Sequence, residues 1–128
     1  MTTSTFTTAI SHASTTTFRV WGLELSNALT TVGFIKSGDT GQIDWATVTR
    51  PAVNVSGGYE IRYLNDSLHG TAPIYMKIEY GTNTTGAAYP AMWITIGTGS
   101  NGSGTITGTT IAREEIVLGI YPLDSTVA

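Results

Sequence analysis

Alternating apolar and polar residues predict two central strands of a β-sheet. Between Ile74 and Tyr80 every second residue has a large apolar or aromatic side chain, with Lys77 and Glu79 among those between, and the run from Met92 to Ile96 alternates in the same way. A period of two is typical of strands with one buried face. The segment between the two runs begins with GTNTTG, which is loop composition. We therefore expect antiparallel neighbours near the centre of a sheet.

A spacing of three and four residues predicts one amphipathic helix, over about residues 17–32 of the segment from Thr15 to Phe34. Thr16 or Thr17 is expected to cap its start, and Gly33 stands where a glycine would end it. Gly22 weakens the interior by about 1 kcal/mol relative to alanine, so a packed face must offset it. The residues expected on that face are Phe18, Trp21, Leu25, Ala28, Leu29 and Val32.

The rest of the chain predicts further strands separated by turns. We expect a short irregular strand over 42–49, ended or placed at an edge by Pro51, and a strand from Tyr59 to Tyr63. One long strand or two short ones are expected over 105–121. The whole pattern predicts a mainly β fold: an antiparallel, jelly-roll-like β-sandwich of five to seven strands with one N-terminal helix. Residues 1–14 are expected to form an extended arm before a single domain over 15–128.

Composition narrows the function classes. Charged residues make up 12% of the chain and the net charge is −3, which does not suit a nucleic-acid partner. The absence of cysteine excludes disulfides and thiolate metal sites. No apolar run approaches the ~20 residues that span a bilayer, so we expect no membrane partner. The first residues lack the pattern of a signal peptide, and we expect a soluble product made in the cytoplasm.

Two motifs resemble catalytic or cofactor sites. The run from Gly97 to Gly102 matches GxGxxG, but strand and turn residues follow it where a dinucleotide site needs a helix. We expect a hairpin loop and no cofactor. His69 lies near Ser67 and Asp66, but a catalytic triad is assembled by the fold and rarely lies within four consecutive residues. We expect no catalytic residue and no enzyme activity.

Metal and glycosidase chemistry are also weakly indicated. His12 and His69 are far apart without a matched carboxylate, and the turn that holds Asp39 and Asp44 is no EF-hand loop, so no metal site is expected. Glu60 and Glu79 lie on predicted strands and are a conceivable glycosidase pair. We expect them instead to be balanced across strands by the two nearby cations, Arg62 and Lys77.

Aromatic residues on the predicted strands are candidates for a binding face. Tyr75, Tyr89 and Trp93 are expected either to stack against a host glycan or to lie in an interface between proteins.

Four spaced segments resemble small virion structural proteins of tailed bacteriophages. The resemblance covers roughly Ala28 to Gly108. The segments are DTGQIDW from Asp39 with TRP from Thr49, GYEIRYLND from Gly58, APIYMKIEYG from Ala72 and WITIGTGSNGSG from Trp93.

This resemblance implies a non-enzymatic structural part of the virion and does not specify which part. We expect a component on the exterior that contacts major capsid or tail proteins. Capsid decoration (cement) is slightly favoured over a tail or fibre component, and a homo-oligomer, most readily a trimer, is expected by analogy. The alternative is a lectin-like receptor-recognition module of a phage tail. Residues 1–17 are expected to serve as an arm that reaches a neighbouring subunit by strand addition.

Overall fold

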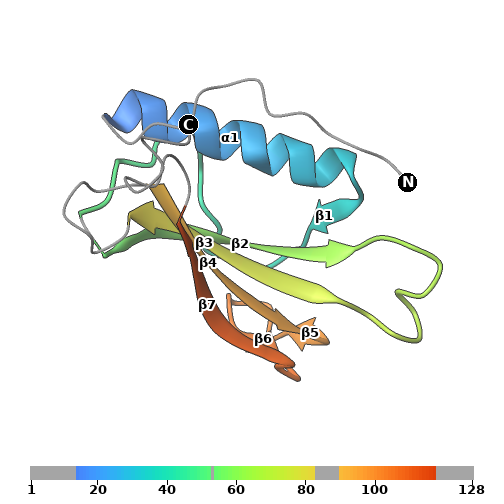
Figure 1. Ribbon diagram of the computed structural model, residues 1–128. Coiled ribbons are helices and arrows are strands. Elements are labelled where there is room, and N and C mark those ends of the chain that lie inside the picture. Colours follow the sequence, from blue (N-terminus) through green and yellow to red (C-terminus); the bar gives the residue numbers. More distant parts are fainter. Residues whose placement is uncertain (1–13, 53, 83–89, 118–128) are drawn as a thin grey trace, which may run out of the picture.

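The computed structural model describes residues 14–52, 54–82 and 90–117. It contains one helix and seven strands (Figure 1). The elements are α1 (Thr15–Thr31), β1 (Phe34–Lys36), β2 (Ser56–Leu64), β3 (Tyr75–Thr82), β4 (Pro90–Gly97), β5 (Gly99–Ser100), β6 (Ile106–Thr107) and β7 (Ile111–Val117). The expectation of a mainly β fold with one N-terminal helix is confirmed.

Five of the strands form one antiparallel sheet in the order β1-β2-β3-β4-β7. The predicted central pair, β3 and β4, is in register from Tyr75 opposite Gly97 to Thr82 opposite Pro90. Helix α1 covers one face of this sheet, and the small β5-β6 sheet lies on the other side (Figure 1). The sandwich therefore has a large sheet and a second sheet that consists of a single hairpin.

The start of α1 is fixed by Ser14. Its hydroxyl accepts a hydrogen bond from the backbone N–H of Thr17, and the Thr17 hydroxyl accepts one from the Ser14 N–H, which together form a capping box. The expectation that Thr16 or Thr17 would be the N-cap is wrong, because Thr17 occupies the third helical position of this box. At the other end Gly33 has φ +104°, a conformation that favours glycine, as its predicted role requires.

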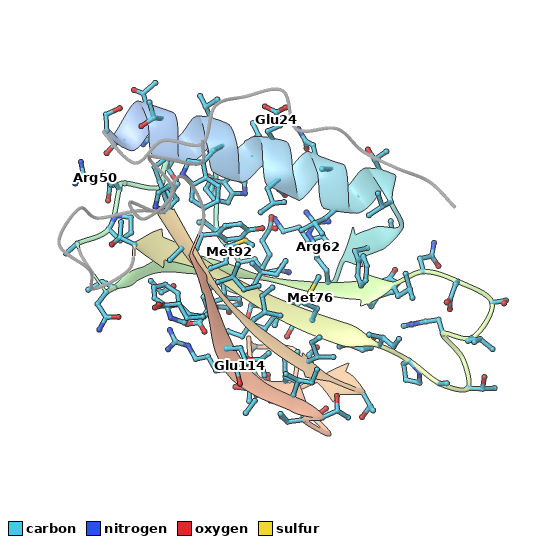
Figure 2. The ribbon with its side chains drawn as sticks, in the orientation of Figure 1. Glu24, Arg50, Arg62, Met76, Met92 and Glu114 are labelled. Carbon is cyan, nitrogen blue, oxygen red and sulfur yellow. The ribbon has the colours of Figure 1, made fainter. Side chains whose placement is uncertain are left out.

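An aromatic cluster fills the space between the helix and the sheet. Phe18 and Trp21 of α1 meet at right angles, and Trp45, from the loop after β1, packs edge-on against Tyr80 of β3 with ring centroids 4.8 Å apart. Met76 and Met92 extend this core along the sheet (Figure 2). Gly22 is required here, because a Cβ on it would overlap the ring of Trp45.

The segment 42–49 is not a strand. The Asp44 carbonyl accepts hydrogen bonds from the N–H groups of Thr47 and Val48, and its carboxylate accepts one from Ala46. The expectation of a strand is therefore wrong: Asp44 bends the backbone into a turn through bonds that a sheet ladder would need. The apolar residues that predicted a strand, Ile43, Trp45 and Val48, instead pack in or against the core beneath the helix.

The Gly22–Trp45 contact generates a first prediction. Gly22→Ala adds a residue of higher helix propensity, worth about 1 kcal/mol, yet we expect it to destabilise the protein by about 1–3 kcal/mol because the methyl group overpacks against Trp45. Urea unfolding followed by tryptophan fluorescence measures the change. Gly38→Ala is the matched control, since a Cβ at Gly38 meets no atom within 4 Å. Equal stability of the Gly22→Ala and wild-type proteins would contradict the packing.

Candidate functional site

The most concentrated polar chemistry lies inside the domain, between α1 and β2. Glu60 and Arg62 point from β2 toward the helix, are 0% and 2% exposed, and form an ion pair at 3.1 Å. Figure 2 shows Arg62 between the helix and the sheet. The groups that hydrogen-bond to this pair are the Ser26 and Thr30 hydroxyls, the Phe34 carbonyl, the Tyr80 hydroxyl and the Trp45 Nε1–H. The Nζ of Lys36 on β1 also lies 3.8 Å from the Glu60 carboxylate.

This environment sets the ionisation of Glu60. Burial raises the pKa of its carboxyl, but the positive charge of Arg62 and the hydrogen bonds from Ser26, Arg62 and Tyr80 outweigh that effect and leave the pKa below its ordinary value. Burial and the adjacent Glu60 carboxylate raise the pKa of Tyr80 well above its ordinary value. Glu60 is therefore a charged group held by fixed donors, which suits a structural role.

Glu79 lies on the opposite face of the sheet. Its carboxylate accepts a hydrogen bond from the Nε of Arg113 on β7 at 2.7 Å. In the register of β2 and β3, Glu60 stands opposite Ile78 and Arg62 opposite Met76. The prediction that Arg62 and Lys77 balance the two carboxylates across strands is therefore wrong. Glu60 pairs with Arg62 of its own strand, and Lys77 lies over the ring of Tyr59.

The two carboxylates cannot flank one substrate. Glu60 is enclosed beneath α1, while Glu79 faces away from the helix, so the sheet itself separates them. A glycosidase requires both groups on either side of a single scissile bond. The arrangement thus removes the geometric basis for a glycosidase built on this pair.

Asp39 holds the second sheet in place. Its carboxylate accepts hydrogen bonds from the Ser37 and Ser100 hydroxyls and from the backbone N–H of Gly104. Burial raises the pKa of Asp39, but these bonds outweigh it and lower the pKa below its ordinary value. The Tyr59 hydroxyl donates to the Thr40 carbonyl nearby. These bonds tie the β5-β6 hairpin to the loop that follows β1.

The glycine-rich run forms the expected hairpin. Gly97 ends β4, Gly99 and Ser100 form β5, and no helix follows before β6. The dinucleotide fingerprint therefore lacks the helix N-terminus that would hold a pyrophosphate. Among residues 14–52, 54–82 and 90–117, no group of three or more His, Asp or Glu side chains has the arrangement of a metal site.

His69 belongs to an aromatic stack. Its ring lies 4.6 Å from that of Tyr63 and 5.8 Å from that of Tyr75, measured between centroids. Tyr63 and Tyr75 are cross-strand partners of β2 and β3. This stack gives His69 a packing role in the turn that joins the two strands.

The proposed glycan-stacking residues are not gathered into one platform. Tyr75 and Trp93 lie on the same face of the sheet, but Trp93 stands opposite Glu79 and Tyr75 stands opposite Gly97, at the other end of the pair. Trp93 is 4% exposed; its ring is covered by the Arg113 guanidinium, and its Nε1–H donates to Glu115. Tyr89 lies outside the described residues.

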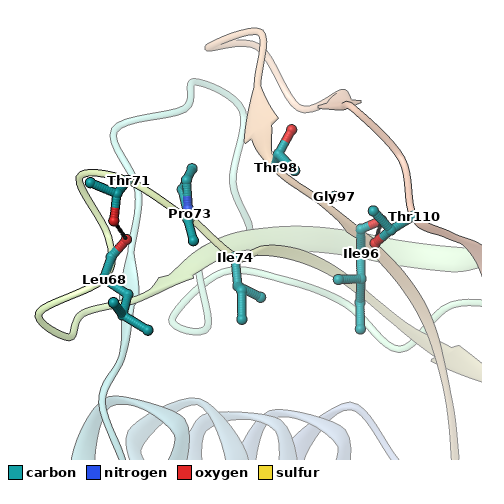
Figure 3. Close-up of a pocket in the computed structure, with 9 residues that line it drawn as sticks. Leu68, Thr71, Pro73, Ile74, Ile96, Gly97, Thr98 and Thr110 are labelled. Atoms are coloured by element: carbon teal, nitrogen blue, oxygen red, sulfur yellow. Dashed lines mark hydrogen bonds between the residues drawn. The ribbon is translucent and has the colours of Figure 1, made fainter.

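An apolar groove of about 740 Å³ opens where β3 begins and β4 ends. Figure 3 shows Leu68, Ile74 and Ile96 pointing to the same side, toward the helix layer. Leu68 and Ile74 are 57% and 43% exposed. Exposed apolar side chains that share a hollow are typical of surfaces that contact another molecule. The remaining lining residues are Thr71, Ala72, Pro73, Gly97, Thr98 and Thr110.

Sequence reasoning missed this groove. Ile74 was assigned to the buried face of a strand, and its alternation with Met76 is correct. Only the fold shows that α1 does not extend over this end of the sheet, so that Ile74 is exposed while Met76 is buried. A signal is present in the apolar residues Leu68, Ala72 and Ile74 around Pro73, because solvent-facing residues of a connecting segment are usually polar.

No protein-family model matches the chain, and neither the curated proteins nor the solved structures include a significant match to it. In the described part of the chain, α1 is the only helix, and it is too short and too polar to cross a bilayer.

The buried ion pair generates a second prediction. Glu60→Gln leaves the Arg62 charge without a counterion, and we expect it to lower the free energy of unfolding by about 3–5 kcal/mol. Glu79→Gln is the matched control: its Arg113 partner is 51% exposed, so the expected loss is below about 1 kcal/mol. Urea unfolding of both variants provides the comparison. Similar losses for the two would contradict the structural role of Glu60.

The lowered pKa values of Glu60 and Asp39 generate a third prediction. A carboxyl whose pKa is lower in the folded state stabilises the fold above its unfolded pKa, and this stabilisation is lost as the pH falls through the folded value. The ordinary pKa values of these carboxyls are 4.5 for Glu60 and 3.8 for Asp39. We therefore expect the stability of the fold to decline below about pH 4.5. As the pH is lowered from about 7 to about 3, the urea midpoint should decrease less steeply in Asp39→Asn than in the wild-type protein. An identical slope would contradict a lowered Asp39 pKa.

Proposed function

We propose that the chain is a non-enzymatic structural component on the exterior of a tailed-phage virion, slightly more in keeping with capsid decoration than with a tail or fibre part. The observation that carries this proposal is the exposed apolar groove around Ile74 and Leu68, which suits contact with another protein. The resemblance between residues 28 and 108 supplies the phage context. The proposed partners are major capsid or tail proteins and further copies of the chain.

The polar side chains support a structural role over a catalytic one. The buried carboxylates Glu60 and Asp39 are saturated with donors from the protein itself, and Glu79 is paired with Arg113. Several of these bonds join separate elements: Ser26 of α1 and Tyr80 of β3 bond to Glu60 of β2. The polar interior thus serves to fix a rigid β domain, as a subunit under mechanical load in a particle requires.

The second candidate is a lectin-like module of a phage tail. It is favoured by the partly exposed aromatic stack of Tyr63, His69 and Tyr75, whose rings lie within 6 Å of one another. Aromatic rings bind the apolar faces of sugars. If the chain is such a lectin-like module, Tyr75 is the residue that contacts the sugar. Trp93 could contact a sugar only if Arg113, which lies over its ring, moved aside.

Binding to particles tests the virion role. Purified protein is mixed with phage particles that lack it, and electron microscopy locates the added density. We expect density at repeated lattice points over the head. Density at the tail alone would mean that the chain is a tail or fibre component and not a capsid decoration protein. Absence of binding to any particle would overturn the virion role.

Two variants sharpen this experiment. Ile74→Asp places a charge in the groove and should abolish particle binding, whereas Thr105→Asp, at an exposed position outside the groove, should leave it unchanged.

Deletion of residues 2–13 tests the arm hypothesis; Ser14 is retained because it caps α1. Loss of particle binding with an unchanged unfolding midpoint is the expected result. Normal binding by the deletion variant would refute the arm's role.

A further inference from the structure

Within the described residues, β7 is an edge strand of the five-stranded sheet. Among the described residues β7 pairs with β4 alone. The Thr110 N–H donates to the Ile96 carbonyl, which therefore points toward β7. Alternate residues of an antiparallel strand point to the same neighbour, so Ile94 also points to β7, where it meets Glu114. The backbone groups of Glu115, next along the strand, consequently point away from β4, to the outer edge.

The charges on this strand are arranged in a self-complementary order. β7 reads IAREEIV, with apolar residues at both ends and charged residues at its centre. If a second copy runs antiparallel with Glu114 at the centre, Arg113 of each copy stands opposite Glu115 of the other. Both side chains lie on one face, since each contacts Trp93. Opposite charges directly across a strand pair stabilise it.

We propose that two copies of this chain associate through antiparallel pairing of their β7 strands about a two-fold axis at Glu114, which joins the two sheets edge to edge. The axis is perpendicular to the sheet, so both copies of α1 lie on the same face. The inference rests on the proposed role as an assembling structural protein, and it specifies a two-fold contact where the resemblance suggested a trimer.

Apolar residues on the other face of β7 fit this contact. Ile111 and Ile116 are 48% and 42% exposed and stand opposite Ile96 and Met92 of β4. These side chains lie on the α1 side of the sheet but beyond its cover. Pairing of two β7 strands sets the two exposed strips side by side, which removes apolar surface from water in both copies.

The charges also select one register. Edge strands often carry charges and bulges that prevent pairing, and β7 has both, with a register shift between Ile94 and Ile96 of β4. A pairing centred on Glu115 sets like charges opposite each other and loses both Arg113–Glu115 pairs. The register centred on Glu114 gains two opposite-charge pairs against one repulsion between the Glu114 side chains. Self-pairing is thus favoured in a single alignment.

Charge reversal tests the proposal on the purified full chain, without phage particles, so that its outcome is independent of particle binding. Sedimentation equilibrium should give a monomer–dimer equilibrium for wild type. Arg113→Glu and Glu115→Arg each create like-charge pairs in the homodimer and should weaken it by at least about tenfold. An equimolar mixture of the two variants should restore a dimer, because their charges complement each other in both pairs.

The restored heterodimer separates loss of pairing from misfolding, since an unfolded variant cannot regain its partner by mixing. Glu114→Gln removes the repulsion at the axis and should strengthen the wild-type dimer. Monomers at every concentration, a trimer, or a dimer that both reversals leave intact would overturn the proposal. A mixture that stays as weakly associated as its folded components would overturn it as well.

Discussion

The ion pair of Glu60 and Arg62 is the constraint on which the domain depends. Two opposite charges are enclosed between a helix and a sheet, where an isolated charge would cost several kcal/mol. Ser26 and Thr30 from α1, the Phe34 carbonyl from β1 and Tyr80 from β3 together satisfy the pair. Since these donors and acceptors come from separate elements, the helix has one position on the sheet in which all bonds are made.

A second polar anchor fixes the other layer. On the side of the sheet away from α1, Asp39 accepts hydrogen bonds from the Ser100 hydroxyl and from the Gly104 N–H of the β5-β6 hairpin. The hairpin is too short to bury a core of its own, so these charge-assisted bonds and the contact of Ile106 with Gly97 hold it in place. The two anchors use Glu60, which sequence reasoning considered as a glycosidase carboxylate, and Asp39, which it considered as a metal ligand.

Apolar side chains are exposed at one end and at one edge of the sheet. The uncovered end of the sheet exposes Ile74 and Leu68, and the edge strand exposes Ile111 and Ile116. Both sets of side chains lie where α1, which packs over the centre of the sheet, does not cover it (Figure 1). A single helix on a five-stranded sheet thus leaves part of the apolar surface of the sheet exposed to solvent.

Local patterns along the chain are sufficient to predict the elements whose signals lie within one segment. The period of two located β3 and β4, the spacing of three and four located α1, and Gly33 located its end, because backbone geometry imposes these patterns on each segment separately. The tertiary structure decided which charges meet. Glu60 bonds to Ser26, 34 residues away, and Glu79 to Arg113, also 34 residues away, and no local pattern encodes those pairings. It also decided that Ile74 is exposed and Met76 buried, since both satisfy the same alternation and only the extent of the helix above them distinguishes one from the other.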